Sequence, residues 1–247
     1  MVVTWGLHMD MQNWALAGLV LFAGFVRGIT GFGGAMVMAP PLSLILGPVK
    51  AVVVSLTLET VAAFVMFPKA LPLVNWRVMA YLTIPACFTV GIGGYLLLTL
   101  DPVIARRFIS GLVVIFSLGL LSGIRYSGAP RPMTSLALGS LVGVLLGATS
   151  VGAPPVILYL LSGPDSVRVT RANLTFFVTA ISVIGLAMLA IAGAVTVEFA
   201  AYAASLAIPF MAGTWLGGLL FERISDVGVR RFALVFMCSI GLIGLLA

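Results

Sequence analysis

Apolar segments separated by short polar stretches make up almost the whole chain. They lie at residues 14–27, 33–46, 49–67, 78–99, 103–123, 133–147, 152–162, 172–193, 196–220 and 227–247. A helix needs about 20 mostly apolar residues to cross a bilayer, because each residue adds only 1.5 Å along the axis. Six of the segments reach that length or come close to it. The pattern therefore predicts an all-α protein that crosses the membrane several times.

The four remaining segments flank two glycine-rich breaks. The first break is residues 27–34, with the sequence RGITGFGG, and the second is residues 147–155, with the sequence GATSVGAPP. Each flanking segment is too short to span the membrane alone, and each joined pair is too long for one straight span. Such a pattern is typical of a re-entrant hairpin or an unwound membrane helix. Paired breaks in two halves of a chain often mark the binding site of a transporter.

An internal repeat divides this single membrane domain (residues 1–247) into two predicted structural repeats, residues 14–123 and 133–247. The matches lie 118 residues apart early in each half and 124 apart later, and they pair Lys50 with Arg168, Gly34 with Gly152, Pro85 with Pro209, Gly93 with Gly217 and Arg106 with Arg230. Each repeat is predicted to hold one broken, re-entrant helix pair and three transmembrane helices. The repeats could be parallel or inverted. The short broken helices, and the tendency of Lys and Arg to stay in cytoplasmic loops, favour inverted repeats.

The composition agrees with a membrane protein. The chain has 247 residues, of which 62% are hydrophobic and 8% charged, whereas a soluble domain carries about 25% charged residues. The formal net charge of +6 comes from basic residues scattered over short loops. Retention of these residues in cytoplasmic loops explains most of that charge, and an anionic substrate can explain the rest. We expect a lipid bilayer and a small anion as partners, and no nucleic acid.

Residues for catalysis or for metal binding are missing from the sequence. Cys87 and Cys238 lie inside apolar segments, and His8 is the only histidine. Nothing resembles a Ser/His/Asp set, a pair of carboxylates or a phosphate-binding loop. We therefore expect no catalytic residue, no metal, no cofactor and no enzyme activity. The lack of a nucleotide-binding sequence also argues against ATP-driven transport by this chain alone.

The two breaks carry the predicted substrate-binding residues. An opened helix must be buried in protein or line a watery cavity, because lipid offers its backbone no hydrogen bonds. The next short helix then begins with free N–H groups, which suit an anion, and residues 152–155 should act like the first break. The predicted set is Arg27, Thr30, Gly31, Gly33, Gly34, Thr149, Ser150, Gly152 and Asn173. The alternative is close helix packing, which also uses small residues.

Charged and polar residues inside the apolar segments add a proton-coupling candidate, Glu59, and two second-tier candidates, Ser55 and Arg171. Glu59 is the only acidic residue well inside a segment, where a carboxylate costs roughly 3 kcal/mol. Three roles remain open for it: a proton-coupling group, a partner of Arg27, or a structural hydrogen-bond acceptor. Ser55 lies one turn earlier on the same face. Arg171 could bind an anion through its planar guanidinium, or it could snorkel at a helix end.

Three stretches resemble a known family. They are residues 28–34 with the following 40–42, residues 147–159, and residues 171–174. Together they resemble the sulfite exporter TauE/SafE family of bacterial membrane transporters, and the likeness covers about residues 14–247. The second break departs from the family in having Ala153 and Pro154, where many members have two further glycines.

The resemblance implies a secondary transporter in the bacterial inner membrane. It would export or exchange small anions such as sulfite or organosulfonates, which would bind between the two breaks near the midplane. A proton could be coupled through Glu59, and a homodimer is compatible with the sequence. Two alternatives remain, an anion channel and a membrane assembly or receptor component without a transport cycle.

Overall fold

The computed structural model describes residues 11–123, 131–161, 163, 165–220 and 226–246. These residues form helices and connecting turns and contain no strand. The helices are α1 (Met11–Thr30), α2 (Gly34–Leu46), α3 (Pro48–Ala70), the 3-10 helix η1 (Leu71–Leu73), α4 (Trp76–Thr99), α5 (Pro102–Leu121), α6 (Pro132–Thr149), α7 (Ala153–Leu160), α8 (Val167–Ile191), α9 (Val197–Leu220) and α10 (Asp226–Leu246). The predicted all-α class is confirmed.

Several helices are suited to crossing a membrane. Five of the described helices, α4, α5, α6, α8 and the described part of α9, are long and apolar enough to span. A sixth span is possible where α3 continues into η1, with a bend of 48° between its two parts. Pro68 lies just after this bend, and a proline inside a helix removes a hydrogen bond to the residue four positions earlier and kinks the helix. The chain is thus a multi-pass membrane protein, as predicted.

The helices on either side of the breaks differ in length from the prediction. All four were expected to be short, and this was wrong for α1, which has 20 residues, and for α6, which has 18. Both continue through the glycines that were taken to open the breaks, Gly28 and Gly147, because a glycine inside a helix costs only about 1 kcal/mol relative to alanine. The breaks are therefore narrower than predicted and consist of residues 31–33 and 150–152.

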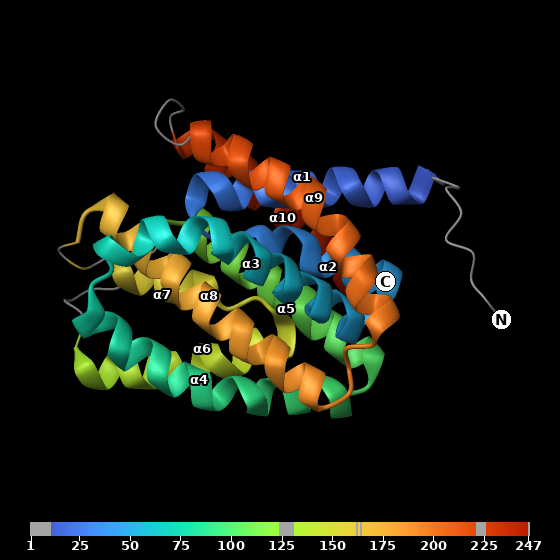
Figure 1. The fold of residues 1–247 in the computed structure, drawn as a ribbon, viewed down its shortest axis with the longest axis horizontal. Helices are drawn as coiled ribbons and strands as arrows, with labels where there is room; N and C mark the ends of the chain where they lie inside the picture. The colour runs from blue at the N-terminus through green and yellow to red at the C-terminus, as the bar shows by residue number, and fades with distance from the viewer. Residues whose placement is uncertain (1–10, 124–130, 162, 164, 221–225, 247) are drawn as a thin grey trace.

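Helices from the two halves of the chain pack against each other reciprocally. Helix α1 lies along α9, while α6 lies along α4 on the other side of the molecule (Figure 1). A Cβ atom at Gly28 would meet the backbone of Thr214 in α9, and one at Gly147 would meet the backbone of Val90 in α4. In addition, α3 packs on α8 and α5 on α10. Two repeats related by a twofold axis would produce such pairing, although the division into repeats and their inverted orientation stay predictions.

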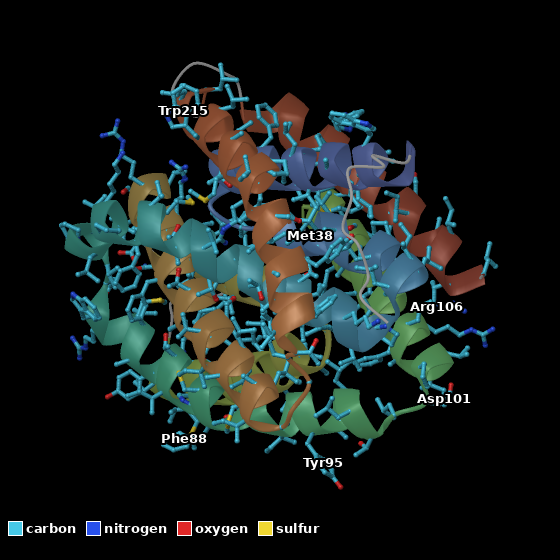
Figure 2. The ribbon with its side chains drawn as sticks, turned by 45° about the vertical axis from the view of Figure 1, so that its right-hand side comes forward. Met38, Phe88, Tyr95, Asp101, Arg106 and Trp215 are labelled. Atoms are coloured by element: carbon cyan, nitrogen blue, oxygen red, sulfur yellow. The ribbon has the colours of Figure 1, made fainter. Side chains whose placement is uncertain are left out.

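The first break lies inside this helical assembly, whereas α4 faces outward. Every residue from Gly31 to Pro40 is buried. By contrast, Phe88 and Tyr95 project from α4 (Figure 2) and are 79% and 68% exposed. Exposed aromatic side chains of this kind suit a helix that faces lipid.

Candidate functional site

The first break is a tight turn held by a threonine hydroxyl. Gly31 and Gly33 have φ angles of 80° and 90°, a region that favours glycine because a Cβ atom is strained there. The Thr30 hydroxyl donates to the carbonyl of Val26 (2.8 Å) and accepts from the N–H of Phe32 (3.2 Å). The predicted ligand Thr30 is thus engaged within its own turn.

A buried ion pair joins the first break to α3. Arg27, in the last turn of α1, is fully buried, and its Nε lies 2.7 Å from Oε2 of Glu59, which is 2% exposed. Arg27 also donates from Nη1 to the carbonyl of Gly31 (3.2 Å). Two of the three roles considered for Glu59 are therefore observed, since it pairs with Arg27 and accepts a hydrogen bond.

The hydrogen bond to Glu59 comes from the start of α2. The N–H of Ala35 donates to Oε1 over 3.1 Å. A Cβ atom at Gly34 would lie 2.8 Å from the same oxygen, so only glycine leaves the carboxylate this close to the helix. A helix N-terminus attracts negative charge. The carboxylate of Glu59 thus occupies the position that the sequence suggested for a bound anion.

Arg171 reaches the break from α8. Its Nη2 donates to the carbonyl of Gly28, and a Cβ atom at Gly31 would lie 2.6 Å from its Cγ. Two arginines therefore sit beside the last carbonyls of α1, where cations are favoured by the helix dipole. Arg171 therefore caps the end of α1 at the first break, and anion binding by Arg171 stays a prediction.

A cleft with a basic lining lies next to Arg171. Its volume is about 510 Å³, and it lies between the end of α3, the start of α8 and α9. Its lining residues are Val65, Met66, Lys69, Ala70, Leu73, Arg168, Arg171, Ala172, Thr175, Met211, Thr214, Trp215, Gly218 and Leu219. The cleft meets the first break through Arg171, which lines the cleft and donates to the carbonyl of Gly28.

The second break repeats the turn of the first. The Thr149 hydroxyl donates to the carbonyl of Leu145 (2.7 Å) and accepts from the N–H of Val151 (3.1 Å). Ser150 has a φ of 57°, like Gly31 in the first turn. The N-caps of the following helices are Gly33 and Gly152. The pairing of Gly34 with Gly152 inferred from the sequence was therefore wrong by one residue.

The surroundings of the second break differ from those of the first. At the spacing set by the two threonines, Leu146 takes the position of Arg27. A Cβ atom at Gly152 would meet Leu146 and Val142. Helix α7 begins with an alanine and two prolines, and proline has no N–H. Only one of its first three residues can donate, whereas all three can at the start of α2. The second break is thus a poorer anion site than the sequence suggested.

Comparison with known proteins agrees with this architecture. The sequence model of the sulfite exporter TauE/SafE family matches residues 16–243. The chain belongs to this family. No curated protein and no solved structure matches it. TauE/SafE proteins are transporters rather than enzymes, and they are multi-pass proteins of the bacterial inner membrane.

Asn173 of this TauE/SafE protein lies apart from the first break. Its Oδ1 accepts from the N–H of Asn75 (2.8 Å), and its Nδ2 lies 3.5 Å from Oδ2 of Asp165. Asn75 also donates to Asp165 (3.1 Å). Asn173 therefore fixes the start of α4 against α8, and the structure does not bring it together with Arg27.

Sequence reasoning about this TauE/SafE chain missed two residues of the cleft, Lys69 and Arg168. Arg168 and Arg171 are three residues apart on α8, with Thr175 four residues further on, and this spacing places them on one face. That spacing was the available signal. Lys69 carried no such signal, because only the packing of α3 against α8 brings it to the cleft.

Proposed function

We propose that this TauE/SafE protein is a secondary transporter that carries a small anion, sulfite or an organosulfonate, by binding it at the first break. The observation that carries this proposal is the place of the Glu59 carboxylate, which contacts both Arg27 and the N-terminus of α2. The site already holds one anionic group, supplied by the protein itself. A substrate anion of similar charge would take its place during transport.

The basic cleft would serve as the entrance. Lys69 and Arg168 are exposed cations at its rim, and such charges raise the local concentration of an anion. Arg171 lies between this cleft and the break. The planar guanidinium groups of Arg171 and Arg27 can each donate two parallel hydrogen bonds to a sulfonate or sulfite.

Protonation of Glu59 would open the site to the substrate. A neutral Glu59 no longer balances the charge of Arg27, and an unpaired buried charge is strongly unfavourable. A substrate anion restores the balance, so that one proton and one anion would occupy the site together. This gives Glu59 the coupling role that the sequence left open.

Transport in vesicles tests the proposal. The purified protein is placed in liposomes loaded with unlabelled methanesulfonate, a sulfonate with no group that titrates near neutral pH, and labelled methanesulfonate is added outside. A carrier should accumulate label transiently by exchange, whereas a channel equilibrates it without accumulation. Liposomes that take up no methanesulfonate and no sulfite would contradict the proposed function.

A further inference from the structure

A polar stripe runs along α8 from the basic cleft into the protein. Its members are Arg168, Arg171, Thr175, Thr179 and Ser182. Successive members are three or four residues apart, so they lie on one face of the helix. The cleft is lined by the first three. Thr179 and Ser182 thus extend the stripe beyond the lining of the cleft.

The facing helix brings Glu59 to the same level. Helices α3 and α8 are antiparallel, since residues 65–66 share the cleft with residues 172–175 while Gly185 lies against Leu56. Between these two contacts, α8 carries Thr179 and Ser182, and α3 carries Glu59. The inner end of the stripe therefore lies at the level of Glu59.

Helices α3 and α8 meet along a seam, and three hydroxyls on these two helices have no hydrogen-bond partner among the described residues. They belong to Ser55, Thr179 and Ser182, which are 0%, 7% and 1% exposed. Leaving a buried hydroxyl unpaired costs about 1–3 kcal/mol, so such groups normally bind water. A Cβ atom at Gly185 would lie 3.4 Å from Leu56. The two helices are therefore in van der Waals contact at this level.

We propose that Thr179 and Ser182 relay a proton from water in the cleft to Glu59, an inference that rests on the proposed function. Each hydroxyl oxygen accepts a proton from a bridging water on the cleft side and releases its own proton to the next water. The last proton forms an O–H bond with Oε2 of Glu59, which gives up its ion pair with Arg27. Only O–H bonds form and break, and the charge of the pair changes from zero to plus one.

The groups packed around Glu59 are consistent with proton transfer from the cleft to its carboxylate. Arg27 contacts it from α1, α2 presents the N–H of Ala35, and α9 presents the ring of Phe210 next to Gly34. Helix α8 carries the two hydroxyls at this level and, toward the cleft, Arg171. Helix α5 carries its charged side chains only near its start, at residues 106–107. In the described residues, the hydroxyls of α3 and α8 are the groups in this seam that can pass a proton on.

The test separates proton movement from anion exchange. The double variant Thr179→Val/Ser182→Ala is compared with Ser110→Ala/Ser117→Ala, a matched control in which two buried, unpartnered hydroxyls of α5 are removed. We expect methanesulfonate uptake driven by a proton gradient to fall about tenfold in the α8 variant, as a barrier rise of about 1.4 kcal/mol would cause. Exchange of labelled for unlabelled methanesulfonate should be unchanged at a pH low enough to keep Glu59 protonated in the empty site, because no proton then has to move during exchange.

The conservative variant Thr179→Ser keeps a hydroxyl and should keep full proton-driven uptake, which guards against a mere packing effect. Unchanged uptake in the α8 double variant would overturn the relay. An equal loss of uptake and exchange in folded protein would also overturn it, since the seam would then carry the anion. If wild-type protein neither exchanges nor accumulates methanesulfonate and sulfite, the proposed function fails and the relay fails with it.

Discussion

The two helix breaks have the same turn in different surroundings. In each, a threonine hydroxyl bonds to the carbonyl four residues earlier and to the N–H two residues later, and the next residue is left-handed. The first turn is bordered by Arg27, Glu59 and Arg171. The second is bordered by Leu146 and followed by two prolines.

This comparison shows that the residues that form the turn differ from the residues that could bind an anion. Thr30 and Thr149 account for the turn, and the turn alone supplies few groups for a ligand. Binding of an anion requires backbone N–H donors at the start of a helix and nearby cations, and these occur at the first break. We therefore expect substitutions at the first break to change transport, and equivalent substitutions at the second break to change mainly stability.

The largest effect should follow loss of one member of the buried pair. Arg27→Leu leaves Glu59 charged and unpaired, which should destabilise the protein by about 3–5 kcal/mol and abolish transport. Thermal unfolding in detergent measures the first effect and liposome exchange the second. The double variant Arg27→Leu/Glu59→Leu should regain most of the stability without transport. Transport by either variant would contradict the assignment of Arg27.

Glu59→Gln should have the opposite effect and strengthen anion binding at the first break. The neutral amide leaves Arg27 available, so methanesulfonate should bind more tightly at neutral pH than it binds to wild-type protein, in which the ionised carboxylate competes for Arg27. Wild-type affinity should rise as the pH falls, and the variant's should stay constant. Titration calorimetry at several pH values measures both. Equal pH dependence in the two proteins would refute a role for Glu59 in coupling.

Substitution of the left-handed residues should distinguish the two turns. Gly31→Ala places a Cβ atom in a strained conformation and 2.6 Å from Cγ of Arg171, so it should cost about 1–2 kcal/mol and impair transport. Ser150→Gly at the equivalent position relieves strain and should leave exchange unchanged. Thermal stability and exchange assays on both variants check this. Loss of transport in Ser150→Gly would show that the second break also contacts the substrate.

The smallest effect should come from the exposed cations of the cleft. Lys69→Gln/Arg168→Gln should slow uptake about two- to tenfold at low ionic strength, and the difference should fade as salt screens the charges. Lys50→Gln serves as a control, since Lys50 lies on the same helix but over the ring of Phe199. A rate loss that is independent of salt would point to direct contact with the substrate instead.

The sequence revealed the helices, the two breaks and the three charged residues of the first break, because their cost in a membrane makes them conspicuous. It misplaced the helix ends, since glycines such as Gly28 remain helical when a neighbouring backbone packs on them. It also could not place Asn173, whose partners Asn75 and Asp165 depend on tertiary packing. The register between α3 and α8, which brings Ser182 to the level of Glu59, was likewise invisible.

The central claim is that a substrate anion replaces the Glu59 carboxylate at Arg27. Calorimetric titration of methanesulfonate in buffers of different ionisation enthalpy measures it directly, because it counts the protons taken up on binding. Near neutral pH we expect wild-type protein to take up close to one proton per anion, by the linkage between protonation and binding, and Glu59→Gln to take up none. Binding by wild-type protein without proton uptake, or with the same uptake in Glu59→Gln, would contradict the claim.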